Sequence, residues 1–471
     1  MEENEIIKKL PKWRQYTLME LPTFLILTAL ALSGTVVSDL IVFQTCRKIL
    51  GEAKNYKCEI LHTNSSSEEA IELVRLVQPL ASYILMWKGL VEGVLPAFLS
   101  LFLGPWSDKY GRKPLLIAAY TGSFLMYVLM TILSKWDVDP WIFLIAFIPS
   151  SLLGGVCVLM LATFCYLTDI TNNDTRAWRL AWFEACLSIG LVVGIFIGPM
   201  IFKIYGYTKL FIVSSTCSGC SLLFIIFFVP ETVFINRENQ KWGSVFDFKL
   251  VKELIETSTK EKVGLNRKSL WGCIITLALL IVILNGDISV GYLFTSARLG
   301  WNTIEYSRFK GLSIAISIIG TIIGVRLFGR TFGFSDTALA MIAAVSSFTA
   351  SMITAFTLKP WHMYTVLFAG SFGGVLSPTI RSVLSKSVPP EDVGKVFSLA
   401  TSVEAILPLI CGPIYTLIYA KYLPPFYPSP VYLLSSTILL FIIIIICYIE
   451  KSINKSLTIF IPLGSDEHSV S

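Results

Sequence analysis

Long apolar runs separated by short polar loops dominate the chain. Each run is close to the roughly 20 residues that an α-helix needs to cross a bilayer. Transmembrane strands are about half as long, and lipid offers no partner to exposed backbone groups, so we predict helices. Twelve runs form two sets of six: 22–43, 80–103, 114–133, 141–168, 178–199 and 209–229, then 270–293, 310–328, 337–357, 361–385, 396–420 and 431–449.

The composition agrees with a chain that lies mostly in lipid. Of its 471 residues, 54% are hydrophobic and only 15% are charged. Soluble domains carry about 25% charged residues, so soluble, disordered and nucleic-acid-binding classes are excluded. The net charge of +6 comes from basic residues scattered among the loops, which indicates membrane orientation rather than a nucleic-acid partner.

The longest polar stretch divides the runs into two groups. We therefore predict an all-α membrane protein with 12 transmembrane helices in two six-helix halves. The predicted domains are a cytosolic N-terminus at 1–21, an N-terminal six-helix bundle at 22–229, a cytosolic central loop at 230–269, a C-terminal six-helix bundle at 270–449 and a cytosolic tail at 450–471.

The two halves carry a Gly-Pro pair in corresponding runs. The fifth run ends in Gly198-Pro199 and the eleventh carries Gly412-Pro413. Parallel halves around a central cavity are a transporter architecture. The fifth run also holds Gly190 and Gly194 in register with Gly198, which favours close helix packing, although drug and proton antiporters carry a similar ladder.

The basic residues set the orientation. With the N-terminus inside, inner segments carry 23 Lys and Arg residues and outer loops carry 13, so both termini are predicted to be cytosolic. Cys46 and Cys58 then share an outer loop, where they either pair as a disulfide or remain free thiols. The same loop holds Asn64 in an N-glycosylation sequon.

The loop after the second run carries a recognisable motif. It reads Gly104-Pro105-Trp106-Ser107-Asp108-Lys109-Tyr110-Gly111-Arg112-Lys113. This resembles the major facilitator signature G-x-x-x-D-x-x-G-R-[RK] in spacing and in place. The resemblance implies the major facilitator fold and a latch on the inner side made by Gly104, Asp108, Gly111, Arg112 and Lys113, rather than a substrate contact.

Longer strings narrow the resemblance. Residues 104–114, Thr175 to Ala181 with Glu184 to Cys186, and Ser377 to Arg381 with Leu384 to Lys386 are similar to the solute carrier 46 group. That group contains the proton-coupled folate transporter and relatives that move other large organic anions. The resemblance implies that Asp169, Glu184 and Arg381 belong to a transport pathway.

Ionisable residues inside the runs are the candidate site. Each costs about 2.5 to 3.5 kcal/mol to insert, so each needs a partner or a water-filled cavity. Asp169, Glu184, Arg381 and Glu404 all fall in the cytosolic half of their runs. Glu184 is a candidate proton carrier and Arg381 a candidate anion-binding residue, and the alternative for Glu184 and Glu404 is a fixed structural salt bridge.

Two further features lie elsewhere in the membrane. Asn285-Gly286-Asp287 interrupts the seventh run nearer its outer end and predicts a locally unwound helix that faces a cavity. Asp287 and Tyr292, just over one turn later, are therefore candidates for this cavity. Lys88 and Glu92 share one helix face in the second run and are interpreted as an internal structural pair.

The histidines argue against a folate-specific site. Folate-transporting members place histidines in the central loop and the seventh span, whereas this chain has only His62, His362 and His468. Carboxylates can carry proton coupling alone, so this weakens the folate assignment more than the coupling.

The leading hypothesis is a secondary active transporter that imports an organic anion with protons. The alternatives are a proton-coupled exporter of amphipathic compounds and a non-transporting membrane receptor. No enzyme motif is present, and no cofactor or metal is expected. We expect the plasma membrane as the location, while Glu2 and Glu3 before Ile6-Ile7 resemble a sorting signal and leave the lysosomal membrane as the alternative.

Overall fold

The computed structural model describes residues 18–51, 57–63, 68–172, 175–233, 267–299, 301, 303–389, 392–421 and 426–460. Helices make up nearly all of this described chain, and no strand occurs in it. The all-α prediction is confirmed. Asn64, His468 and most of the predicted central loop lie outside the described residues.

The chain divides into two units. The first comprises Met1–Thr163 and Cys186–Val245. Its helices are α3 (Glu20–Leu50), α4 (Ile60–Thr63), α5 (Glu68–Tyr110), α6 (Arg112–Leu133), η2 (Pro140–Ile142), α7 (Phe143–Leu152), the larger part of α8 (Gly155–Asp169), and α9 (Arg176–Phe228) from Cys186 onward.

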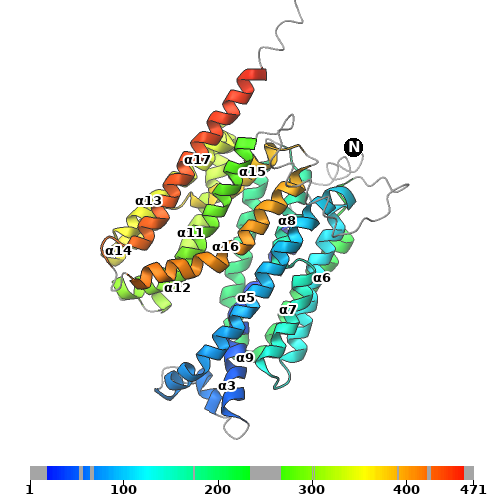
Figure 1. Ribbon diagram of the computed structural model, residues 1–471, viewed down its shortest axis with the longest axis vertical. Coiled ribbons are helices and arrows are strands. Elements are labelled where there is room, and N and C mark those ends of the chain that lie inside the picture. Colours follow the sequence, from blue (N-terminus) through cyan, green and yellow to red (C-terminus); the bar gives the residue numbers. More distant parts are fainter. Residues whose placement is uncertain are drawn as a thin grey trace, which may run out of the picture. The chain divides into compact units, whose positions relative to one another are not determined.

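The second unit comprises Phe164–Ala185 and Phe246–Ser471. It holds the ends of α8 and α9 not in the first unit, α11 (Arg267–Leu299), α12 (Thr303–Gly324), the π-helical η3 (Val325–Thr331), α13 (Asp336–Ala355), α14 (Pro360–Ala369), η4 (Gly373–Val375), α15 (Leu376–Lys386), α16 (Val393–Lys421) and α17 (Pro430–Phe460). Within this unit α11 packs beside α16 and α17, and α13 packs beside α17 (Figure 1). The predicted bundle boundaries stay a prediction.

Eleven described helical elements are long and apolar enough to cross a membrane. One of them, α9, has 53 residues, or about 80 Å at 1.5 Å per residue, which far exceeds a bilayer core of about 30 Å. Its backbone is non-helical at Gly206, where φ is 75°. Counted as two helices across this kink, α9 contains the fifth and sixth predicted spans, and the described helices account for all twelve.

Two spans are interrupted in the middle, which we did not predict. The fourth breaks between α7 and α8, where Gly154 and Gly155 have φ of 98° and 54°. The tenth breaks between α14 and α15 at the 3₁₀ turn η4. Because of this second break, α15 is a separate short helix that carries Arg381.

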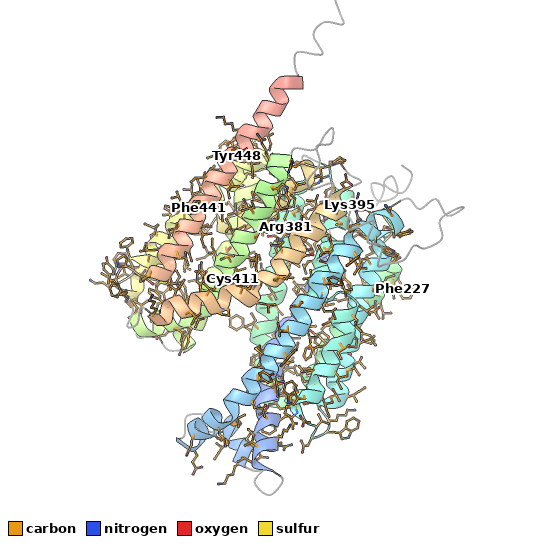
Figure 2. All side chains as sticks on the ribbon, in the orientation of Figure 1. Phe227, Arg381, Lys395, Cys411, Phe441 and Tyr448 are labelled. Carbon is orange, nitrogen blue, oxygen red and sulfur yellow. A yellow bond between two sulfur atoms is a disulfide. The ribbon has the colours of Figure 1, made fainter. Side chains whose placement is uncertain are left out.

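The surface and the packing both suit a membrane protein. Figure 2 labels Phe227 on α9 and Phe441 and Tyr448 on α17, three large side chains that are exposed. Inside the first unit α9 packs closely on α3, because a Cβ atom on Gly194 would lie 2.6 Å from the carbonyl oxygen of Thr28. This contact favours the packing interpretation of the glycine ladder.

Candidate functional site

The candidate site is centred on Arg381 of α15. Ser377 and Arg381 are four residues apart and therefore lie on one face of this helix. Glu404 comes from α16, and Glu184 comes from the first turns of α9 within the same unit. Three residues that were predicted separately from the sequence are thus brought together.

Arg381 is held by two carboxylates. Its Nη2 donates to Oε1 and Oε2 of Glu404, at 3.0 and 2.9 Å. Its Nε lies 3.6 Å from Oε1 of Glu184, and the same oxygen accepts a hydrogen bond of 2.9 Å from the Ser377 hydroxyl. The guanidinium therefore bridges α9 and α16, with Glu404 as the closer partner.

An aromatic wall covers one face of the guanidinium. The Cζ atom of Arg381 lies 4.2 Å from the ring centroid of Phe164, at the end of α8. That ring packs edge-on against Phe183 and stacks on Phe397, with centroid distances of 5.7 and 6.1 Å. Phe164 thus supplies a cation–π contact and shields one side of the cluster from water.

The hydrogen bonding of Arg381 is incomplete. Its residue surface is only 6% exposed, yet Nε and Nη1 are buried without a hydrogen-bond acceptor among the described residues. Buried donors are nearly always satisfied, because leaving one unpaired costs about 1 to 3 kcal/mol. The arrangement can accept a further anionic group at one of these two donors, because a guanidinium forms strong charge-assisted hydrogen bonds with carboxylates.

Asp169, the fourth predicted member, lies at the C-terminal end of α8 and interacts electrostatically with Arg176 instead. Arg176 also donates to the hydroxyl of Ser385 at 3.0 Å and to the carbonyl of Thr168 at 3.3 Å. Asp336 of α13 belongs to this second group, where it pairs with Lys386 at 2.8 Å. The structure therefore groups Asp169 with Arg176.

Asp287 and Tyr292 lie on α11. The Asp287 carboxylate accepts a hydrogen bond of 2.9 Å from Ser435 of α17, whose hydroxyl also contacts Tyr415 at 3.1 Å. The ring of Tyr292 packs against that of Tyr306, with centroids 5.5 Å apart. The helix is continuous through Gly286, so the predicted local unwinding is not seen.

The latch motif is a tight network at the start of α6. Arg112 is 2% exposed, and its Nη2 lies 2.5 Å from Oδ1 of Asp108. The backbone amides of Arg112 and Lys113 donate to the two carboxylate oxygens of Glu231, at 2.8 and 3.0 Å. Glu231, rather than Asp108, therefore occupies the helix N-terminus, where a negative charge is favoured.

The backbone conformation of the motif favours glycine at position 111. Gly111 separates α5 from α6 with φ of 115°, a conformation that residues with a Cβ rarely adopt. Gly104 accepts a hydrogen bond of 2.8 Å from Ser107 through its carbonyl. The turn positions Arg112 to bind both Ser107 and Asp108.

A disulfide joins Cys46, in the last turns of α3, to Cys58, with Cα atoms 6.0 Å apart. His362 accepts a hydrogen bond from the Leu358 amide and packs against Trp361 at the start of α14. Among the described residues, no group of three or more His, Cys, Asp or Glu side chains could hold a metal ion.

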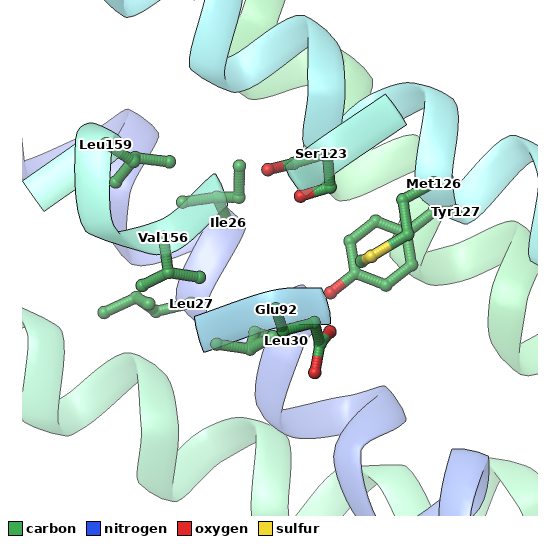
Figure 3. Close-up of a pocket in the computed structure, with 10 residues that line it drawn as sticks. Ile26, Leu27, Leu30, Glu92, Ser123, Met126, Tyr127, Val156 and Leu159 are labelled. Atoms are coloured by element: carbon green, nitrogen blue, oxygen red, sulfur yellow. The ribbon is translucent and has the colours of Figure 1, made fainter. Parts of the chain in front are cut away.

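A small pocket lies inside the first unit (Figure 3). The carboxylate of Glu92 and the hydroxyl of Tyr127 face a space whose other walls are mostly apolar, including Ile26 and Val156. Lys88 pairs with Glu92 at 2.6 Å, and its ammonium lies 4.8 Å from the ring centroid of Phe147. The acid in this pocket is therefore neutralised by its own helix.

Sequence reasoning missed three contributors. Ser377 occurs in a string that was singled out, and Glu231 lies just after the sixth predicted span, but neither had been given these partners. Phe164 carries no signal of its own, because an aromatic residue in an apolar run is ordinary. The spacing of Ser377 and Arg381 is the one clue that was available.

Comparisons with known proteins agree with the sequence resemblance. A sequence model of the Major Facilitator Superfamily matches residues 80–413. The chain is 25% identical over 415 residues to a Drosophila melanogaster protein named "Probable peptidoglycan muropeptide transporter SLC46", covering 86% of this chain and 80% of that one. It is 26% identical over 363 residues to the proton-coupled folate transporter of Bos taurus, covering 76% and 77%. The predicted likeness to solute carrier 46 proteins is confirmed.

Solved structures confirm the fold. The human organic anion transporter MFSD10 (TETRAN) superposes with a TM-score of 0.70 at 16% identity, over 93% of this chain and 100% of that one. The fucose:proton symporter FucP of E. coli gives a TM-score of 0.62 at 14% identity, over 92% and 98%. At such identities the likeness bears on the fold alone.

Proposed function

The chain belongs to the Major Facilitator Superfamily, and from this premise we propose that it imports a carboxylate-bearing organic anion together with protons by alternating access. The family consists of membrane transporters rather than enzymes. The single observation that carries the anion assignment is the unsatisfied hydrogen bonding of Arg381, whose Nε and Nη1 are buried without an acceptor among the described residues.

In the proposed cycle, protonation and anion binding are linked at Arg381. While Glu184 is ionised, its charge attracts the Arg381 guanidinium, and the two lie 3.6 Å apart. Protonation of Glu184 removes that attraction and leaves Arg381 with an uncompensated share of positive charge, which a substrate carboxylate then balances. Substrate and proton therefore bind together and cross together.

Glu404 has a different role in this proposal. It accepts both hydrogen bonds from Nη2 of Arg381, so it holds the guanidinium in place whether or not substrate is bound. Asp169 belongs to the inner cluster around Arg176 and contributes to closing the cytosolic side rather than to the anion site. The network of Gly104, Asp108, Gly111, Arg112 and Lys113 is the proposed cytosolic latch.

The relatives support the substrate class. One is named as a probable muropeptide transporter and another as a proton-coupled folate transporter. Muropeptides and folates differ in shape, but both are polar, carry carboxylates and suit an arginine site. The absence of histidines from the seventh span makes a muropeptide-like acid the better first candidate.

Uptake measurements test this proposal. Cells expressing the full chain at their surface are given a labelled muropeptide or a labelled folate analogue in acidic or neutral medium. We expect acid-stimulated uptake that Glu184→Gln abolishes and that Glu92→Gln, the matched control in the other unit, retains. If neither compound enters at either pH while the protein is at the surface, import of these anions is wrong.

Export of amphipathic compounds is the second candidate. The pocket beside Glu92 and Tyr127 is the feature that favours it, since exporters of cationic compounds use acidic, partly apolar cavities. The 2.6 Å pair with Lys88 weakens this reading because it removes the net negative charge. Efflux of a lipophilic cation from preloaded cells, lost in Glu92→Gln, would favour export over import.

We propose the plasma membrane as the location, with the lysosomal membrane as the alternative. An importer of external anions acts at the plasma membrane, with both termini in the cytosol, while an importer into the cytosol from a degradative compartment acts at the lysosome. Imaging of the full chain with a tag at either end, before and after permeabilisation, separates these cases and tests the orientation.

A further inference from the structure

A second polar cluster in the second unit is built from residues outside the Arg381 site. Asp287 of α11, Lys310 and Tyr306 of α12, and Ser435 of α17 belong to it. Lys310 was not among the candidates from the sequence. An ammonium group within a membrane-spanning helix is costly, so its place in the fold needs a reason.

The packing of α11 on α12 fixes the position of Lys310. A Cβ atom on Gly291 would lie 2.6 Å from the Tyr306 hydroxyl, so these two residues lie at the same height along the paired helices. Asp287 precedes Gly291 by one turn, and Lys310 follows Tyr306 by one turn. Consecutive membrane helices run antiparallel, which places Lys310 level with Asp287, and the two charges interact electrostatically.

The two charges are held very differently. Asp287 is fixed by its hydrogen bond from Ser435 at 2.9 Å, and Ser435 is in turn in contact with Tyr415. Tyr415 packs directly on the α11 backbone, because a Cβ on Gly286 would lie 2.4 Å from its ring. The aspartate cannot move far without disturbing this packed group.

Lys310 has no such anchor. Its ammonium lies 6.0 Å from the ring centroid of Tyr306. Within the described part of the chain, the structure shows no acceptor at hydrogen-bond distance from this ammonium and no direct ion pair with Asp287. A long, flexible cation near a fixed acid is able to turn toward another anion.

We propose that Lys310 binds a carboxylate of the transported anion, as a second subsite distinct from Arg381 in its residues. This rests on the proposed function. The ammonium donates to a carboxylate oxygen of the substrate, the Tyr306 ring covers its other side, and Asp287 balances its charge when the subsite is empty. Such a subsite selects acids that carry a carboxylate over their amides.

Binding to the purified full chain tests this subsite. The probes are a muropeptide and folic acid, each compared with its form in which the terminal carboxylate is amidated, and binding is followed by ligand-induced thermal stabilisation. Loss of one charge-assisted hydrogen bond corresponds to an affinity change of about tenfold or more. We therefore expect Lys310→Gln to weaken binding of the acid about tenfold and leave binding of the amide nearly unchanged, with Lys310→Arg retaining most of the preference.

A double variant separates binding from structure. If Lys310 only neutralises Asp287, then Lys310→Gln weakens the acid and the amide alike, and adding Asp287→Asn restores both, which would overturn the proposal. The proposal instead predicts that the double variant still lacks the preference for the acid. If the wild type binds none of the probes, the proposed function and this subsite both fail; if it binds and prefers the acid while Lys310→Gln keeps that preference, only the subsite fails.

Discussion

Two buried arginines in this protein are held in opposite ways. Arg112 of the latch donates to Ser107 at 2.7 Å and pairs with Asp108 at 2.5 Å, while its backbone amide binds Glu231. Arg381 is similarly buried, but only its Nη2 makes hydrogen bonds, and its Nε and Nη1 find no acceptor among the described residues.

We interpret the difference as one between a charge network that fixes a local arrangement and, under the proposed function, a charge that stays available to substrate. A network whose donors face fixed acceptors on neighbouring turns stabilises one local arrangement. A guanidinium with unused donors, two nearby carboxylates and an aromatic wall retains capacity for another anion. Burial alone does not distinguish the two arginines, whereas the count of satisfied donors does.

The largest expected effect comes from Arg381→Lys. Lysine keeps the positive charge that Glu184 and Glu404 need, but it lacks the planar pair of donors. We expect the protein to reach the membrane at near wild-type levels and the initial rate of acid-stimulated uptake to fall roughly 100-fold, equivalent to one or two charge-assisted hydrogen bonds. If uptake stays within about threefold of wild type, the change is too small for a lost charge-assisted hydrogen bond. The anion would then bind at a site other than Arg381.

The same substitution at the other arginine is the matched control. In Arg112→Lys one ammonium must serve both Ser107 and Asp108, so we expect the free energy of unfolding to fall by about 1.5 to 3 kcal/mol. Thermal unfolding of the purified chain measures the loss. Uptake per molecule at the surface, measured with impermeant labelling, should change far less than in Arg381→Lys. An equal loss of uptake in the two variants would contradict the proposed difference between the two arginines.

Glu231→Gln sharpens the structural side of the comparison. The variant keeps one oxygen that can accept from one of the amides of Arg112 and Lys113, replaces the other oxygen with an NH2 group that cannot accept, and removes the negative charge at the start of α6. We expect a loss of about 1 to 2.5 kcal/mol in unfolding free energy, from the charge at the helix N-terminus and one lost amide hydrogen bond. A Glu231→Ala variant should lose more, since it also removes the acceptor, and equal losses would argue against the helix-terminus role.

Ser377→Ala gives the smallest effect and tests the functional side. It removes the hydrogen bond of 2.9 Å to Glu184 without touching Arg381. One such bond contributes about 0.5 to 1.5 kcal/mol, so we expect uptake to change by roughly two- to tenfold with little loss of stability. Ser382→Ala, on the same helix but bonded to Asp336, is the control that should leave the pH dependence of uptake unaltered.

The membrane spans and the main charged residues of the candidate site could be predicted from the sequence. Hydropathy gave the spans, and the membrane charges singled out Glu184, Arg381 and Glu404, because an ionisable residue in an apolar run is rare. Their depth along the spans also agreed. Depth does not specify which neighbour a side chain faces, however, and Asp169 accordingly lies with Arg176 rather than with Arg381.

The mid-span breaks were harder to predict. Apolar residues continue through both, so hydropathy alone shows one long helix. The signals were glycines, at Gly154-Gly155 in the fourth span and at Gly370, Gly373 and Gly374 in the tenth. The lysine at position 310 was overlooked because the eighth run was predicted to begin there, whereas α12 begins at Thr303 and places Lys310 about two turns inside the helix.

Exchange and accumulation in proteoliposomes test the central claim most directly. Glutamine at position 184 mimics the protonated acid, so the account predicts that Glu184→Gln still exchanges labelled for unlabelled substrate across the membrane but no longer accumulates substrate when a proton gradient is imposed. The wild type should do both. A Glu184→Gln protein that accumulates substrate as the wild type does would contradict the proposed coupling of proton and anion at Arg381.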